Sequence, residues 1–245
     1  TGDDSEIWGL HISPDLDTVT YTLAGLIDET KGWGFKDESF RCLQAMAVLG
    51  GETWFNLGDR DLATHLFRTE SLRRGQPLSV VTDAIRRALG VRSRILPMSD
   101  QPVRTKVRST TGWLTFQEFF VREKAQVEVL DVAYEGAEAS RPAPGVVDAI
   151  REARAVVICP SNPVTSIGPI LAVPGIVDAL RDTPAVVVAI SPIVAGAAVS
   201  GPGAALIAAL GLPVSAAGVA WAYQEWLDIM VLDRQDQTLT PELGR

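Results

Sequence analysis

Three short apolar runs in the second half of the chain constrain the fold more than any other feature. They cover residues 155–159, 185–190 and 229–232. Helical patterns lie beside and between them at 146–153, 176–181 and 204–210. Short β-branched runs that alternate with helices are typical of βαβ units, whose strands pair in parallel. The sequence therefore predicts an α/β fold with a doubly wound, mainly parallel sheet.

The first half has a different pattern. Helical spacing predicts a helix that begins after Ser13 with Pro14 at its first position, and further helices at 40–48, 62–72 and 79–89. Alternating runs at 104–109, 112–116 and 127–132 favour antiparallel or mixed strands. We expect one domain over 1–245, with a smaller α+β insert at about 30–135 and a core of about 1–29 and 140–245.

Composition excludes several classes of protein. With 22 basic and 30 acidic residues the net charge is −8, which argues against a nucleic-acid or anionic-membrane surface. No apolar run approaches the roughly 18 residues of a membrane span, and no signal peptide opens the chain, so we expect a cytoplasmic protein. Two cysteines and two histidines leave no disulfide framework or zinc cage. A metal would be a hard ion such as Mg²⁺, held by carboxylates.

Four carboxylates lie close together near the N-terminus: Asp3, Asp4, Asp15 and Asp17. Packed together they would repel one another unless a cation neutralised them, and Mg²⁺ bound by one or two carboxylates and substrate phosphates is a common arrangement. The alternative is plain helix capping, because acidic residues are favoured in a first helical turn.

The segment GDRDLATHL at 58–66 places Arg60 between Asp59 and Asp61. Arg60, held by its neighbours, could bind a phosphate with two hydrogen bonds, or the three side chains could form a surface network. His65 lies one helical turn beyond Asp61 and is a candidate general base, although a lone helical histidine is also a common structural residue.

Polar loops follow two of the expected strands. The loop after 155–159 carries Ser161, Asn162, Ser166 and Gly168, and Ser191 follows 185–190. In a doubly wound sheet ligands bind at the carboxyl ends of strands, and hydroxyl and backbone groups there suit phosphates. The alternative is an ordinary loop made of turn residues. The chain has no Walker motif, no complete G-x-G-x-x-G and no G-x-S-x-G elbow.

These segments together resemble the 2-phospho-L-lactate transferase family of coenzyme F-420 biosynthesis. The resemblance rests on stretches that follow the family's order over nearly the whole chain. They are TGDD at 1–4, SPDLDTVTYTLAG at 13–25, GWG at 32–34, GDRDLATHL at 58–66, FQEFFV at 116–121, PSNPVTSIGPILAVPGI at 160–176, SPIVAG at 191–196 and YQEWLDIMVLD at 223–233.

The resemblance implies an enzyme that transfers a phospholactyl or phosphoenolpyruvyl group from a guanosine diphosphate-activated donor to the deazaflavin Fo, releasing GMP. It implies a Rossmann-like fold, a homodimer and Mg²⁺ bound by Asp3 and Asp17, with Asp4 and Asp15 beside them. Asp4 would also act on the Fo hydroxyl. Arg60, oriented by Asp59 and Asp61, would bear on the donor phosphates, and His65 is a further candidate for proton transfer. The donor's guanosine diphosphate part would bind at Ser161, Asn162, Ser166 and Gly168, with Ser191 close by.

Two features separate the chain from the family pattern. Family members begin with a strand and a Gly-Gly-x-Gly-Gly loop ahead of the TGDD segment, and they continue beyond the equivalent of Arg245. We therefore expect the chain to be incomplete at both ends, and weakly active or inactive alone. The alternative function is a nucleotide-sugar-binding regulatory protein of the related gluconeogenesis-factor family. Its members carry a DDGGSSG-type run where this chain has Ser5-Glu6-Ile7-Trp8 after the acidic pair.

Overall fold

The computed structural model describes residues 2–199, 201, 203–209 and 211–239. The chain opens with a hairpin of β1 (Ser5–Ile7) and β2 (Leu10–Ile12), which pair antiparallel. Trp8 and Gly9 turn the hairpin with φ values of 53° and 72°, the positive pair that a tight two-residue hairpin loop needs. Helix α1 (Pro14–Leu23) follows, and the prediction of Pro14 at its first position is confirmed.

Three helices complete the first half of the chain: α2 (Arg41–Val48), α3 (Asp59–Arg73) and α4 (Leu78–Ala88). The helix expected at 62–72 begins earlier than predicted, because Asp59 and Asp61 belong to the first turn of α3. The reason is a contact that is distant in sequence. The Glu38 carboxylate accepts hydrogen bonds from the backbone N–H groups of Arg60 and Asp61, and so satisfies the start of the helix.

The middle of the chain forms an antiparallel sheet with the strand order β4-β3-β5, as the alternating pattern predicts. Its strands are β3 (Arg104–Ser109), β4 (Gly112–Thr115) and β5 (Asp131–Glu135). The short helix η1 (Glu118–Arg122) follows β4. The third strand was expected at 127–132 and lies later, because its register with β3 pairs Val132 with Val107 and Glu135 with Arg104. That register is set between strands and is not visible in the local pattern.

The second half contains a parallel sheet with the order β10-β7-β6. Its strands are β6 (Ala155–Ile158), β7 (Val186–Ile190) and β10 (Ile229–Val231). The helices of this half are α5 (Val146–Arg151), η2 (Pro163–Ile167), α6 (Gly168–Leu171), α7 (Ile176–Asp182), α8 (Gly203–Ala209), α9 (Ala216–Tyr223) and η3 (Arg234–Leu239). Strands β8 (Ile193–Val194) and β9 (Ala197–Ala198) form a small hairpin after β7. Residue 210, the expected end of α8, lies outside the described residues.

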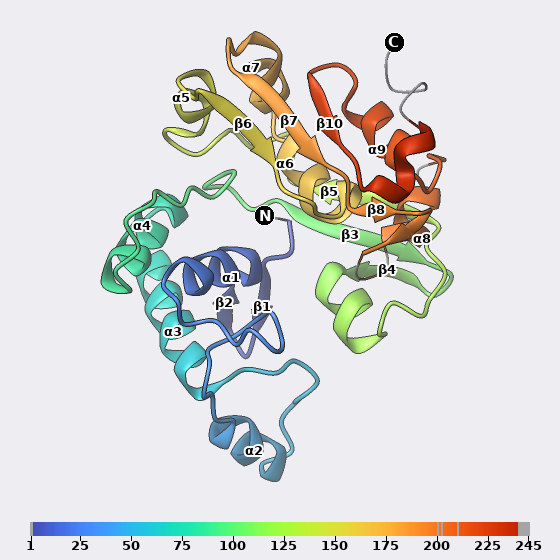
Figure 1. Cartoon of the computed structure of the whole chain (residues 1–245). Coiled ribbons are helices and arrows are strands. Elements are labelled where there is room, and N and C mark those ends of the chain that lie inside the picture. Colours follow the sequence, from blue (N-terminus) through green and yellow to red (C-terminus); the bar gives the residue numbers. More distant parts are fainter. Residues whose placement is uncertain (1, 200, 202, 210, 240–245) are drawn as a thin grey trace.

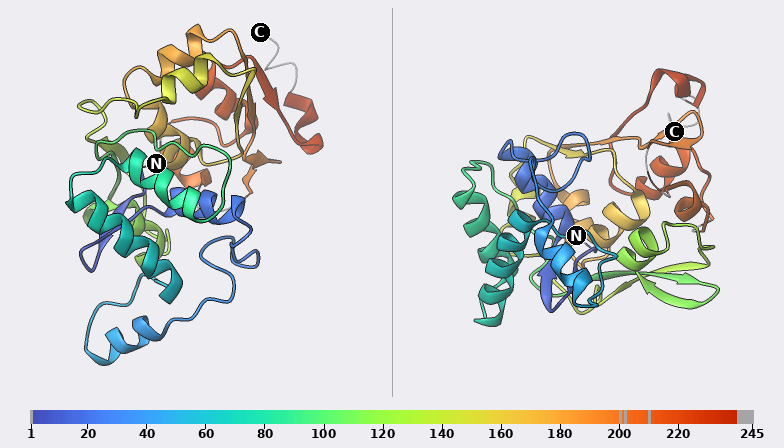
Figure 2. Two further views of the ribbon diagram at one scale, coloured as in Figure 1. Left: turned by 90° about the vertical axis from the view of Figure 1, so that its left-hand side faces the viewer. Right: turned by 90° about the horizontal axis from the view of Figure 1, so that it is seen from below.

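The molecule is thus a mixed α/β structure with one small parallel sheet and several antiparallel pairs (Figure 1). The N-terminal hairpin and α1–α4 form one part, and both larger sheets lie in the other (Figures 1 and 2). Among the described residues no single helix is long and apolar enough to cross a membrane. One pair of helices, 163–171 and 176–182, passes the same test of length and composition but is bent by 84°.

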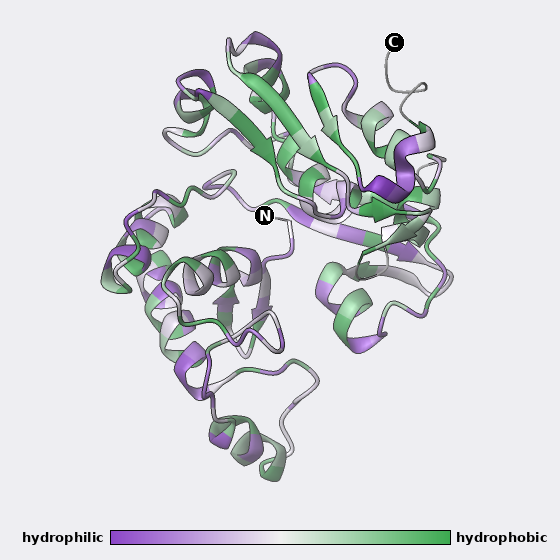
Figure 3. Ribbon diagram, in the orientation of Figure 1, coloured by the Kyte–Doolittle hydropathy of each residue, from purple (hydrophilic) through white to green (hydrophobic). Residues whose placement is uncertain are grey.

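The parallel sheet is covered on one side. Val187 and Ala189 of β7 are buried in the main hydrophobic core, and helices α5 and α7 lie on that side of the sheet (Figures 1 and 2). The opposite face carries exposed apolar residues: Val157, Val186, Ile229 and Val231. Figure 3 shows the apolar colour running along all three strands, as expected for strands of a parallel sheet.

Candidate functional site

A cavity of about 300 Å³ lies between the N-terminal part and η1, and it gathers acidic and aromatic side chains. Its carboxylates come from the N-terminal turn, from α1 and from α3: Asp3, Asp15, Asp17 and Asp61. Its aromatic side chains are Tyr21, Trp33, Phe55, Phe116 and Phe120. Phe116 and Phe120 stack nearly parallel, with ring centroids 5.6 Å apart and planes 7° apart. The cavity therefore has a charged region and flat apolar walls.

Asp17 is held by a buried cation that the sequence analysis missed. Arg68 of α3 is 1% exposed and donates hydrogen bonds to both carboxylate oxygens of Asp17, from Nη1 to Oδ2 at 3.1 Å and from Nη2 to Oδ1. Burial lowers the pKa of Arg68, but the charge and hydrogen bonds of Asp17 outweigh it, and the pKa lies above its ordinary value. Arg68 follows His65 by three residues, so helical spacing was the one local signal that could have placed it on the same face.

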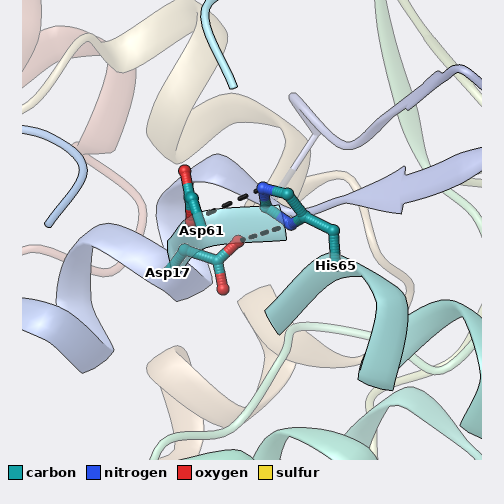
Figure 4. Close-up of side chains that lie close together, drawn as sticks. All are labelled: Asp17, Asp61 and His65. Atoms are coloured by element: carbon teal, nitrogen blue, oxygen red, sulfur yellow. Dashed lines mark ion pairs between the residues drawn. The ribbon is translucent and has the colours of Figure 1, made fainter. Parts of the chain in front are cut away.

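His65 lies between two carboxylates (Figure 4). Its Nδ1 is 3.7 Å from Asp17 Oδ2, and its Nε2 is 3.5 Å from Asp61 Oδ1. The hydroxyl of Tyr21 donates to the same Asp61 oxygen at 2.7 Å. Burial raises the pKa of Asp61, but the nearby imidazole of His65 and the hydrogen bond from Tyr21 more than offset this effect and leave the pKa below its ordinary value. One oxygen each of Asp17 and Asp61 and one nitrogen of His65 lie within 4.8 Å of one another, a grouping that metal sites also show.

Asp3 and Asp15 form a second carboxyl pair at the cavity. Asp3 is buried, and its Oδ2 accepts a 3.4 Å hydrogen bond from the Gln117 side chain. A hydrogen bond also links the side chains of Asp15 and Asp3. Burial raises the pKa of Asp15, the nearby charge of Asp4 adds to that effect, and the pKa lies above its ordinary value. Two adjacent carboxyl groups in a partly closed space are suited to a cation.

Asp4 faces away from this cavity. It lines two others, of about 370 and 200 Å³, and Arg104 lines both of them as well. Asp4 Oδ2 lies 3.0 Å from Nε2 of His11 and 3.8 Å from Nη1 of Arg104. Burial opposes ionisation of Asp4, yet the hydrogen bond from His11 and the neighbouring positive charges hold its pKa below the ordinary value. Asp4 is thus close enough to Asp15 to raise its pKa, but it lines different cavities from the other three N-terminal carboxylates.

The structure gives Arg60, Asp59 and Asp61 separate contacts. The Arg60 guanidinium donates to the Lys36 carbonyl at 3.0 Å and lies over the Phe35 ring at 4.5 Å. The Asp59 carboxylate accepts from Ser39 and from the backbone N–H groups of Arg41 and Cys42 at the start of α2. Asp61 faces Tyr21 and His65, as described above. The expectation that the two aspartates orient Arg60 is thus not met.

The polar loop after β6 is ordered by its own side chains. Asn162 Oδ1 accepts from the backbone N–H groups of Val164 and Thr165 at 2.9 and 3.2 Å, which caps η2. The backbone N–H of Ser166 donates to the Asn162 carbonyl at 3.0 Å, and Ser161 is half-buried beside it. Gly168 packs so closely on the Tyr134 hydroxyl that a Cβ there would overlap it. Packing is therefore one sufficient reason for a glycine at this position.

Ser191, after β7, is buried and bonds within its own turn. Its hydroxyl donates to the Ile193 carbonyl at 2.8 Å and accepts from the Ile193 N–H at 3.1 Å. Neither Ser191 nor the four residues chosen from the 160–168 loop line the acidic cavity. The acidic turn nevertheless lies close to the end of this loop, since Gly2 packs against Pro169 of helix α6.

Comparison with known proteins identifies the family. A family model described as 2-phospho-L-lactate transferase CofD matches residues 1–242. The chain belongs to the CofD family. As a member of this family it is a transferase, and its function is that of the 2-phospho-L-lactate and phosphoenolpyruvate transferases.

Some relatives are named phosphoenolpyruvate transferases and others 2-phospho-L-lactate transferases. The phosphoenolpyruvate transferase of Streptomyces griseus is 46% identical over 249 residues, which cover 99% of this chain and 78% of that protein. The 2-phospho-L-lactate transferase of Methanocaldococcus jannaschii is 41% identical over 247 residues, covering 99% of this chain and 79% of that protein. The crystal structure of protein BH3568 from Bacillus halodurans shares the fold, with a TM-score of 0.51 and 18% identity over 90% of this chain and 73% of that one.

Proposed function

We propose that this CofD family member transfers a phospholactyl or phosphoenolpyruvyl group from a guanosine diphosphate-activated donor to the deazaflavin Fo. The acceptor hydroxyl oxygen forms a bond to the phosphorus of the transferred group. The bond from that phosphorus to the bridging oxygen breaks, and GMP leaves with that oxygen. The proton of the hydroxyl passes to a carboxylate or to solvent. Such a displacement needs alignment and charge neutralisation more than covalent protein chemistry.

The observation that carries the proposal is the combination of flat aromatic walls and carboxylates in one cavity of about 300 Å³. A deazaflavin is a planar heterocycle with a polyol chain. Its ring fits against aromatic side chains such as Phe116 and Phe120, and its hydroxyls suit the carboxylate end. We therefore place Fo in this cavity. Asp4 does not line it, so we do not assign to Asp4 the proton transfer from the Fo hydroxyl.

We propose Mg²⁺ at the carboxylates of Asp3 and Asp15. The donor set fits a hard cation, because the two carboxyl groups adjoin one another and are largely buried. Both oxygens of Asp17 are bonded to Arg68, so Asp17, which the family resemblance pairs with Asp3, would have to share its oxygens with that cation. When bound, the ion would offset the negative charge of the diphosphate during transfer. The aromatic walls of the cavity would position the acceptor next to the ion.

For the donor we propose the loops that follow β6 and β7. Ser161, Asn162, Ser166, Gly168 and Ser191 would hold its guanosine diphosphate part, with Arg60 at the phosphates. This assignment rests on the expected Rossmann-like, doubly wound arrangement, in which ligands bind at the carboxyl ends of parallel strands. The contact of Gly2 with Pro169 supports it, since this contact brings the acidic turn to helix α6, which directly follows the first of these loops. We also propose a homodimer, which light scattering of the purified protein would test.

The test is a coupled assay of the chain as it stands. It is incubated with Fo, Mg²⁺ and the donor carrying either phospholactate or phosphoenolpyruvate, and the deazaflavin product is followed by mass. Because the chain alone is expected to be weakly active at most, we expect a small amount of product with one donor and none without Mg²⁺. Binding of GDP and Fo is measured in parallel by calorimetry. A folded chain that binds GDP but neither binds Fo nor yields product with either donor would overturn the transferase proposal and favour the regulatory alternative.

A further inference from the structure

Arg68 contacts several acceptors from inside the protein. Its Nη1 lies 3.1 Å from Asp17 Oδ2, 3.3 Å from His65 Nδ1 and 3.4 Å from the His11 carbonyl oxygen. A guanidinium group carries only hydrogen-bond donors. Two N–H groups cannot bond to one another, so the Nδ1 atom that faces Arg68 must be the acceptor. The geometry thus leaves the proton of the His65 imidazole on Nε2.

The Nε2–H group is left without a partner. His65 is 1% exposed and lines the cavity, and no group among the described residues hydrogen-bonds to its Nε2. Asp61 Oδ1 is 3.5 Å away and already accepts from Tyr21 at 2.7 Å. A buried donor without a partner is costly, and such groups are often satisfied by a ligand.

A donor and an acceptor therefore stand side by side at the cavity: the Nε2–H of His65 and the carboxylate of Asp61. A hydroxyl group matches this pair, because it accepts one hydrogen bond and donates another. A phosphate oxygen does not match it, because it has no proton for Asp61 and would meet two negative charges, those of Asp61 and Asp17.

We propose that Arg68 is a positioning residue that fixes His65 as a donor, and that His65 and Asp61 together bind a hydroxyl group of the acceptor's polyol chain. The proposal rests on the proposed function for the identity of that acceptor. It also separates this cluster from a metal site. A metal on Nε2 would require the proton on Nδ1, where Arg68 directs its own N–H.

The tautomer is tested first, without any substrate. The chain has two histidines, His11 and His65, so a nitrogen-15 spectrum of the imidazoles shows two patterns. The pattern lost in His65→Gln belongs to His65. We expect Nε2 to be protonated and Nδ1 bare. A protonated Nδ1 would overturn the proposal, even if Fo binds and is converted.

Hydroxyl recognition is tested by affinity. Fo is compared with a deazaflavin ring that carries a methyl group in place of the polyol chain. We expect His65→Leu to bind Fo about tenfold more weakly and the methyl compound unchanged, since one hydrogen bond of about 1–1.5 kcal/mol is lost. The glutamine side chain of His65→Gln offers an N–H at a similar place, so this variant should still bind Fo more tightly than the methyl compound, by nearly the wild-type ratio.

Arg68 has its own variant and its own readout. In Arg68→Lys the protein keeps a buried cation beside Asp17. We expect the nitrogen-15 spectrum of this variant to show both tautomers of His65. We also expect the ratio of its affinity for Fo to its affinity for the methyl compound to fall part of the way toward that of His65→Leu. If His65→Leu lowers the affinity for Fo and for the methyl compound equally, His65 has a general structural role, and the proposal is overturned. Failure of the wild-type protein to bind either compound would instead refute the proposed function, while the tautomer result would still stand.

Discussion

Gly2 packs against Pro169, and this contact joins the acidic turn at one end of the sequence to helix α6, directly after the polar loop that follows β6. A Cβ built on Gly2 would lie 2.7 Å from Cβ of Pro169 and would also overlap the Thr105 hydroxyl. The backbone takes part too, since the N–H of Thr105 donates to the Gly2 carbonyl at 2.7 Å. Gly2 is therefore the residue that lets Asp3 reach the cavity while the turn stays close to the loop.

Replacing Gly2 by alanine should destabilise the protein. The added methyl group overlaps side chains on both sides, and overpacking of this kind costs about 1–3 kcal/mol. Urea unfolding followed by tryptophan fluorescence measures the loss. Val48→Ala is the control, because Val48 is 88% exposed and its substitution leaves the packing of the core unchanged. Equal stability of the Gly2→Ala and wild-type proteins would contradict the packing argument.

Removal of the Asp59 carboxylate should loosen α2. This helix has no buried residue, and Asp59 accepts hydrogen bonds from two N–H groups at its start. The Ser39 hydroxyl and these N–H groups hold the pKa of Asp59 below its ordinary 3.8. A lowered carboxyl pKa stabilises the folded state above the unfolded value, and the stabilisation is lost as the pH falls through the lowered pKa.

Hydrogen exchange of residues 41–48 provides the measurement. We expect the protection factors of α2 in the wild-type protein to hold at pH 5–7 and to fall once the pH drops well below 3.8. In Asp59→Asn they should be low throughout. Asp182→Asn, at the end of α7, is the control. Unchanged protection of α2 in Asp59→Asn would show that packing, and not the capping carboxylate, holds the helix.

Phe120→Ala should weaken Fo binding. Phe120 is 41% exposed at the cavity and stacks on Phe116, so its loss removes part of the flat wall. Stacking of a planar ring on an aromatic side chain contributes about 1–3 kcal/mol, so we expect a tenfold or greater rise in Kd. Trp221→Ala, also exposed but outside the cavity, should bind Fo normally. Equal affinities in both variants would place the deazaflavin elsewhere.

Asp15→Asn should lower the affinity for Mg²⁺ by tenfold or more, measured by calorimetry with the ion alone. Because burial holds the pKa of Asp15 above 3.8, protons compete with the ion and affinity should decrease as the pH is lowered. Asp182→Asn again serves as the control. If Asp17→Asn abolishes binding while Asp15→Asn has no effect, the pair is Asp3 and Asp17, as the family resemblance implies.

The mixed α/β class could be predicted because its signals are local. The runs at 155–159, 185–190 and 229–232 are strands in the structure, and Pro14 does begin α1. The family could also be predicted from the sequence, since long motifs such as GDRDLATHL occur in it without interruption. The expected division into an insert and a core stays a prediction.

The site was predicted in part. Asp3, Asp15, Asp17, Asp61 and His65 do meet at one cavity, although no spacing rule showed that α3 would pack beside α1. Asp4 lines two other cavities, because neighbours in an extended turn point to opposite sides and only the surrounding elements decide which cavity each one faces. Arg68 was missed because a buried arginine looks like any surface residue of a helix until its partner is known.

The sequence by itself determined most of the helices, the strands of the parallel sheet, the family and the chemical types present in the site, because these depend on neighbours along the chain. The tertiary structure decided which carboxylate faces which cavity, that Arg68 binds Asp17, and that Asp59 caps α2 instead of orienting Arg60. Each of these depends on side chains that are far apart in sequence, and for the buried pair of Arg68 and Asp17 the surrounding protein strengthens the interaction beyond what the same pair would have in water.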